Sequence, residues 1–164
     1  MSSSTLVANL DYVNWLKQIK QRIHSVRMKV ALAANSELIA LYYEIGAQIV
    51  ERESTVRWGS KFIDAFSKDL KAEFPDVGGF SAKNLRYCRA FFRFYCVPEI
   101  WQRAVAKLTT EPWAGVDTEL AQRLAQIPWG HHIQIFTKAS SLDEATFYLT
   151  QTIEEGWSRD VLAL

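Results

Sequence analysis

The sequence has few of the residues that interrupt helices and no long apolar run. Only seven glycines and four prolines occur among its 164 residues, which argues against low-complexity tails. No run approaches the roughly 18 apolar residues of a membrane-spanning helix, and the first residues lack the regions of a secretory signal. No segment repeats at a fixed period, which argues against a solenoid. We therefore expect a cytoplasmic protein without a membrane partner.

Cysteine is also scarce, because only Cys88 and Cys96 are present. Both fall on one predicted helix, where their separation along the axis is about 12 Å. A disulfide requires Cα atoms within about 7 Å, so this pair cannot form one. We expect two buried thiols in a reducing compartment.

The chain also has no large excess of positive or negative charge. Lys and Arg number 19 against 18 Asp and Glu, and the net charge of +1 gives no global attraction to nucleic acid or acidic membranes. Any electrostatic binding surface must therefore be local. Apolar residues make up 49% of the chain, which is enough for one domain to bury a core.

Apolar residues recur at steps of three and four, the period of amphipathic helices. Asn35 and Ser36 could end one helix and cap the next, which predicts two helices in a hairpin, with one long kinked helix as the alternative. Trp58 and Gly59 mark a turn. The predicted helices cover residues 11–34, 35–53, 62–74, 81–97, 99–108, 118–127, 130–139, 142–155 and 158 onward.

These patterns predict an all-α fold in a single domain over residues 1–164. Residues 1–10 are expected to be flexible, and residues 109–117 are expected to form a loop. The segment "HHIQIFTK" also has strand propensity, so a small β wing is the alternative there.

The segment "GGFSAKNLRYCRAFFRF" carries the clearest charge pattern. Four basic residues fall within about a third of the helix circumference, opposite an apolar arc. Ser81 is a good N-cap. Asn84 could contact DNA, but because it projects toward the apolar arc it could brace the turn instead. The basic residues are Lys83, Arg86, Arg89 and Arg93.

The order of helix, glycine-containing turn and capped basic helix is typical of a helix-turn-helix, whose second helix lies in the major groove of DNA. Arg and Lys would contact phosphates and guanine edges, while Ser81 and Asn84 would add neutral hydrogen bonds. A surface helix needs a polar face in any case. From these residues alone, a solvated face remains the simpler interpretation.

Other groups of reactive residues are weaker. Asp64, Asp69 and Lys71 resemble a nuclease carboxylate string, but the two carboxylates lie roughly 140° apart on a helix. His131 and His132 are adjacent and point about 100° apart, so bracing a turn is a simpler role than metal binding. We expect no metal, no cofactor and no catalytic residue.

Several segments resemble, in order, the N-terminal domain of the bacterial YhcG family. They are "NSELIALYYEIGAQIVERE", "WGSKFIDAFSKDLKAEFPDVGGFSAKNLRYCRAFFRFY", "IPWGHHIQIFTK" and "FYLTQTIEEGWSRDVL". The sequence departs from the family at Ala82 and Lys83, where members commonly have a bulkier polar residue and an arginine. The middle segment, residues 97–124, is variable.

This resemblance implies a helical domain of helix-turn-helix character, which in full-length members precedes a PDDEXK nuclease domain. The chain ends before that domain would begin, so we expect a non-catalytic, DNA-binding or targeting domain. Lys61 and Lys68 of the preceding helix would then contact the DNA backbone. The alternative is an interaction module that dimerises through residues 11–53 or binds a separate nuclease subunit.

Overall fold

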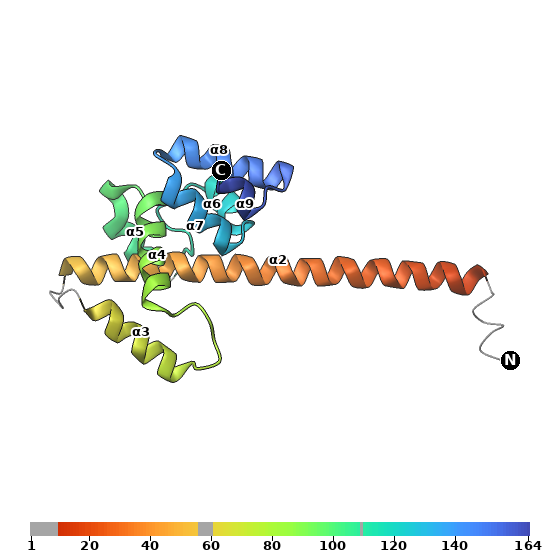
Figure 1. Ribbon diagram of the computed structural model, residues 1–164, viewed down its shortest axis with the longest axis horizontal. Coiled ribbons are helices and arrows are strands. Elements are labelled where there is room, and N and C mark those ends of the chain that lie inside the picture. The colour runs from red at the N-terminus through yellow and green to blue at the C-terminus, as the bar shows by residue number, and fades with distance from the viewer. Residues whose placement is uncertain (1–9, 56–60, 109) are drawn as a thin grey trace. The chain divides into compact units, whose positions relative to one another are not determined.

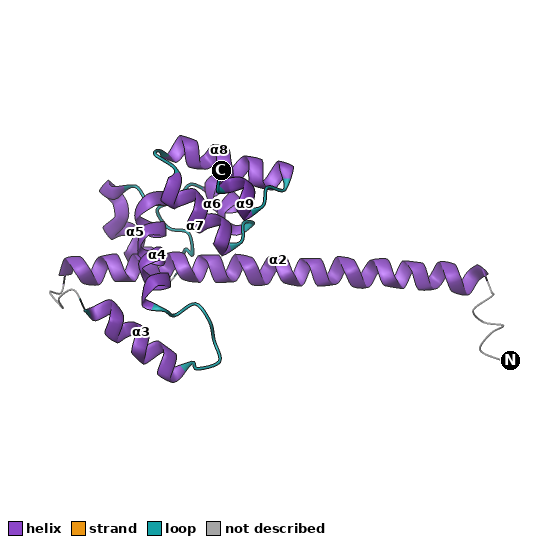
Figure 2. Ribbon diagram, viewed as in Figure 1, coloured by secondary structure: helices purple, strands orange, loops and turns teal. Residues whose placement is uncertain are grey.

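The computed structural model describes residues 10–55, 61–108 and 110–164. These residues form helices joined by turns, and no strand occurs among them (Figure 2). The expected all-α fold is therefore confirmed. Two compact units are present, Met1–Ala34 and Asn35–Leu164. The turn predicted at Trp58 and Gly59 lies outside the described residues. So does the segment predicted to be flexible, residues 1–10, except for Leu10, which is the first residue of the first described helix.

Most helices begin and end close to the predicted positions, because local capping signals set them. Ser81, Ser141 and Ser158 each accept a hydrogen bond from the backbone N–H three residues later, as N-caps do. In chain order (Figure 1) the helices are α2 (Leu10–Thr55), α3 (Phe62–Glu73), α4 (Ala82–Tyr95), the 3₁₀ helix η1 (Pro98–Ile100), α5 (Trp101–Lys107), α6 (Thr118–Ala125), α7 (Trp129–Lys138), α8 (Leu142–Glu155) and α9 (Arg159–Leu162).

The structure corrects two predictions. Residues 11–53 are not a hairpin, because α2 continues through Asn35 and Ser36. The Asn35 side chain does not cap a helix but donates hydrogen bonds to the carbonyls of Ala125 and Ile127, at 3.2 and 3.1 Å. The segment considered for a β wing lies within α7, so that alternative is wrong. Within the part of the chain that is described, no helix is long and apolar enough to cross a membrane.

The main core of the second unit is built on aromatic rings. Tyr43 of α2 contacts Phe92 and Phe91 of α4, with ring centroids 5.0 and 6.1 Å apart. Ile135 of α7 and Leu149 of α8, from later in the chain, belong to the same core. Each such side chain contributes roughly 1.5–3 kcal/mol by leaving water. The part of α2 from Ile39 onward and α4 are therefore packed tightly against one another.

Gly46 explains how closely α2 and α4 approach. A Cβ atom at this position would lie 2.0 Å from the backbone carbonyl oxygen of Cys88, so only glycine allows this contact. Cys88 and Cys96 are both buried and free, which confirms that they are buried thiols. Burial raises the pKa of the Cys88 thiol to about 12. This thiol therefore serves packing rather than chemistry.

A second, smaller core joins α2, α3 and α4 through Ile49, Ile63 and Leu85. The connection between α3 and α4, residues 74–81, is longer than the turn of about three or four residues typical of a helix-turn-helix. Ser67 of α3 donates a 2.6 Å hydrogen bond to the carbonyl of Phe80 and so ties this connection to α3. The helix-turn-helix interpretation stays a prediction.

Candidate nucleic-acid interface

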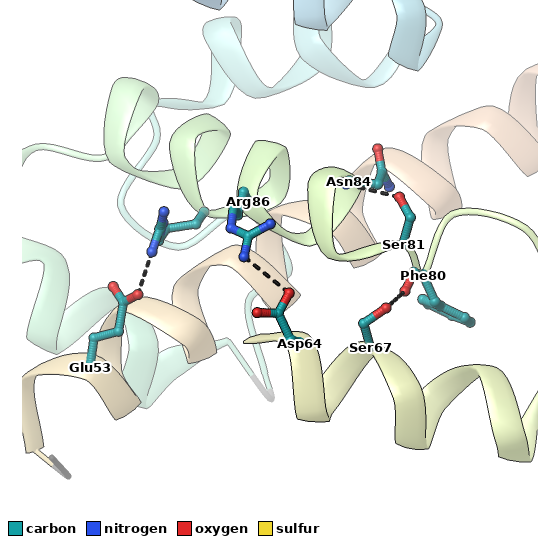
Figure 3. Close-up of polar contacts among 8 residues, drawn as sticks. Glu53, Asp64, Ser67, Phe80, Ser81, Asn84 and Arg86 are labelled. Carbon is teal, nitrogen blue, oxygen red and sulfur yellow. Dashed lines mark hydrogen bonds and ion pairs between the residues drawn. The ribbon is translucent and has the colours of Figure 1, made fainter. Parts of the chain in front are cut away.

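The start of α4 is fixed by side chains that sequence analysis proposed as DNA contacts. The Ser81 hydroxyl oxygen accepts the backbone N–H of Asn84 at 3.1 Å, as an N-cap (Figure 3). Asn84 donates from Nδ2 to the Gly79 carbonyl at 2.7 Å and accepts the indole N–H of Trp129 at 2.6 Å. Both ends of the Asn84 amide are therefore engaged in bracing the turn, one of the two roles its projection suggested.

Gly79 makes this turn possible. Its φ of 96° lies in the left-handed region, and a Cβ atom there would lie within 2.2 Å of the Tyr42 hydroxyl oxygen. The carbonyl that Asn84 holds belongs to this same glycine. The turn thus sets where α4 begins and how its basic face is presented.

The three arginines of α4 are paired with carboxylates of other helices. Arg86 Nη2 lies 3.1 Å from Asp64 Oδ1 of α3, and Figure 3 shows the two side chains pointing toward one another. Glu53 of α2 binds two arginines at once, Arg89 through Oε1 and Arg93 through Oε2, the latter at 3.0 Å. Sequence reasoning considered Asp64 only as part of a nuclease string and did not name Glu53. It predicted neither pairing, because partners 22 to 40 positions away give no local signal.

These pairs differ in how much solvent reaches them. The side chains of Arg86 and Arg93 are 44% and 55% exposed, whereas Arg89 is 27% exposed beside a Glu53 that is 24% exposed. Exposed ion pairs contribute at most about 1 kcal/mol. Arg86 and Arg93 can therefore exchange a carboxylate for another anion at little cost, while Arg89 is held more firmly.

The lysines named from the sequence extend the same surface. Lys83 is exposed on the first turn of α4, with its Nζ 5.8 Å from the ring centroid of Tyr87. Lys61, the N-cap residue of α3, and Lys68, within α3, are both exposed. They stand three residues before and four residues after Asp64, so they lie on its side of the helix. Because Asp64 reaches Arg86, these lysines lie toward the basic side of α4.

A groove not foreseen from the sequence lies between α2 and α3. Its volume is about 660 Å³. Apolar side chains form much of its wall, and both acidic and basic residues contribute. The lining residues are Leu41, Glu44, Ile45, Gln48, Ile49, Arg52, Phe62, Ala65, Phe66 and Asp69.

The residues considered for a nuclease or metal site, two aspartates and two histidines, are not brought together into one site in the structure. Asp64 pairs with Arg86, and Asp69 lines the groove. In the described part of the chain no three His, Cys, Asp or Glu side chains come together as metal ligands would. His131 and His132 each hydrogen-bond through Nε2 to a backbone carbonyl, of Trp157 at 3.0 Å and Leu124 at 2.8 Å.

Comparison with known proteins adds one family and one curated relative. The family described as the DUF1016 N-terminal domain matches residues 18–164. A protein of Escherichia coli (strain K12) named "Putative nuclease YhcG" is 30% identical over 150 residues. That match covers 83% of this chain and 39% of the relative, so the chain spans well under half of the relative's length. No solved structure matches the chain.

Proposed function

The chain belongs to the family of DUF1016 N-terminal domains, and from this membership we propose that it is a non-catalytic domain that binds DNA and targets a nuclease part. Its similarity to a protein named as a nuclease supports an association with nucleic acid. The nuclease part would be in the same polypeptide or in a separate subunit.

The observation that carries the proposal is the basic surface of α3 and α4. Lys61, Lys68, Lys83, Arg86 and Arg93 are exposed there. Lys and Arg side chains of this kind bind phosphate oxygens. Ser81 and Asn84 hold the turn before α4, so the basic side chains have no part in holding it. Arg86 and Arg93 would turn from Asp64 and Glu53 to phosphates, because their present pairs are exposed and weak.

The first test is a fluorescence-anisotropy titration with a duplex of about 20 base pairs at about 50 and 200 mM salt. We expect binding at the lower salt that weakens steeply at the higher one, because counterions are released from DNA. The Arg86→Gln/Arg93→Gln variant should bind at least about fivefold more weakly, since two phosphate contacts are lost.

The matched control is Arg103→Gln/Lys107→Gln, which removes two exposed charges from α5. An equal loss of affinity in this control, or no binding of the wild-type chain at low salt, would contradict the proposed surface. Magnesium-dependent cleavage of DNA by the chain alone, abolished by Asp64→Asn or Asp69→Asn, would contradict the non-catalytic role.

The groove between α2 and α3 favours a second candidate function, a protein-interaction module. An apolar groove of this size can receive side chains of a partner, such as a second copy of the chain or a nuclease subunit. Light scattering separates the two functions. An interaction module should form oligomers or complexes that Leu41→Gln disrupts, and it should have no salt-sensitive affinity for DNA.

A further inference from the structure

The helix of the first unit carries an apolar stripe at coiled-coil spacing. Leu16, Ile19, Ile23, Val26, Val30 and Ala33 follow alternating steps of three and four residues, the pattern of positions a and d in a heptad. On a helix they fall within about 100° of the circumference. Ile19, Ile23, Val26 and Val30 are between 40% and 64% exposed.

Within residues 10–34, the part of this unit that the structure describes, no side chain buries the stripe. Residues 10–34, the described part of the unit, are a single stretch of α2, so they contain no second element to pack against. A helix with large β-branched residues exposed along one side gains stability mainly by burying that side. The stripe is therefore a surface suited to a partner helix.

The charges beside the stripe all have the same sign. Lys20 and Arg27 occupy the e positions on one flank, and Arg22 and Lys29 occupy the g positions on the other. No acidic residue occurs between Asp11 and Glu37. The opposite side of the helix carries one further basic residue, Lys17, together with uncharged polar residues such as Gln21 and Ser25, so four of the five basic residues flank the stripe. The positive charge is thus concentrated where a coiled-coil partner would lie.

This arrangement disfavours a second copy of the chain. In a parallel pair, Arg22 of one helix would face Arg27 of the other, and in an antiparallel pair each flank would face its own basic equivalent. Like charges at these positions repel one another, whereas acidic residues at the e and g positions of a partner helix would attract the basic residues of this chain. An acidic lipid surface would accept the charges, but it suits a broad apolar face rather than this narrow stripe.

We propose that residues 12–33 bind a partner helix whose own heptad stripe is flanked by Glu or Asp, forming a heterotypic coiled coil. The apolar stripe supplies affinity, and the four basic flanking residues select the acidic partner. This binding site is separate from the DNA-binding surface proposed for α3 and α4 and does not depend on it.

The test uses the full chain and two synthetic four-heptad peptides with the same Ile and Leu positions. One peptide has Glu at every e and g position, and the other has Lys. By fluorescence anisotropy, the Glu peptide should bind and the Lys peptide should not, with tighter binding at lower salt. The variant Lys20→Glu/Arg22→Glu/Arg27→Glu/Lys29→Glu should reverse this preference.

Matched substitutions test the stripe itself. Ile23→Gln/Val26→Gln should weaken binding of the Glu peptide at least about tenfold, because two buried side chains are lost. Met28→Gln/Leu32→Gln removes two exposed apolar residues from the opposite side and should change the affinity less than about twofold. Circular dichroism checks that helix content is kept, and DNA affinity should be the same in both variants.

Three results would overturn the proposal. The first is equal binding of the Glu and Lys peptides. The second is a dimer of the chain, seen by light scattering, that Ile23→Gln/Val26→Gln dissociates, since a second copy would then occupy the stripe. The third is binding to vesicles of phosphatidylserine and phosphatidylcholine with no binding of the Glu peptide. None of these results bears on the proposed DNA contact.

Discussion

His132 shows how burial changes the chemistry of one residue. The side chain is completely buried, with its ring centroid 5.0 Å from that of Phe91. Nε2 donates to the carbonyl of Leu124 at 2.8 Å, while Nδ1 has no hydrogen-bond partner. Burial lowers the pKa of His132 from 6.5 to about 4, because the charged form would lose its hydration.

This shift predicts a pH-dependent stability. Below pH 6.5 the unfolded chain binds a proton at residue 132 that the folded chain does not bind until about pH 4, so stability falls as pH falls through that interval. Between pH 7 and pH 5 the loss should be about 2 kcal/mol. Urea unfolding of wild type and His132→Gln measures it, since the variant should lack this loss. His24→Gln, at an exposed position, should retain it.

At the scale of the element, α4 carries a buried apolar face and a basic face whose charge other helices partly cancel. Leu85, Cys88, Phe91 and Phe92 are buried. Across from them, Glu53 of α2 lies between Arg89 and Arg93. The electrostatic character of α4 is therefore a property of three helices together.

The variant Glu53→Gln tests this cancellation. Removing one negative charge beside Arg89 and Arg93 should raise DNA affinity at low salt by roughly twofold or more, because the phosphates then meet more net positive charge. The cost in stability should be about 1 kcal/mol, since the ion pairs are only partly buried. Glu119→Gln, which breaks the Arg123 pair on α6, is the matched control and should leave DNA affinity unchanged. If the Glu53→Gln variant binds DNA with unchanged affinity, DNA does not contact the basic face of α4.

The two units differ in how strongly packing protects their backbone amides from hydrogen exchange. In the second unit, α2 contributes Ile39, Tyr43, Ala47 and Val50 to the core. In the first unit, residues 10–34 form helix without any buried side chain. Local opening costs least where few apolar contacts must break.

Hydrogen exchange should therefore divide α2 in two. Amides of residues 12–33 are expected to exchange at least about a hundredfold faster than those of residues 39–50, because the former open without unfolding the core. Mass spectrometry of peptides from both segments measures the difference. Adding the Glu-flanked peptide should slow exchange in residues 12–33 alone. Equal protection of the two segments without peptide would contradict this view of the first unit.

Local chemistry in the sequence was enough to predict most elements. The apolar period predicted the helices, and Ser81 was predicted as the N-cap that it is. The helices predicted over residues 62–74, from 142 and from 158 begin or end within one residue of those positions. The prediction failed at Asn35, where cap propensity was outweighed by hydrogen bonds to carbonyls some ninety residues away. Cap propensity reflects only neighbouring residues, so it gives no information about a hydrogen bond to such a distant part of the chain.

Three features follow from the order of residues alone: the chain is helical, α4 is amphipathic with its basic residues on one face, and residues 12–33 carry a heptad stripe with basic flanks. Each of these follows from the 3.6-residue period, which relates only near neighbours. Three other features required the folded chain: the pairing of Glu53 and Asp64 with the arginines, the hydrogen bond from Trp129 to Asn84, and the groove between α2 and α3. Those contacts join residues far apart in the chain, and only the packing of helices brings them together.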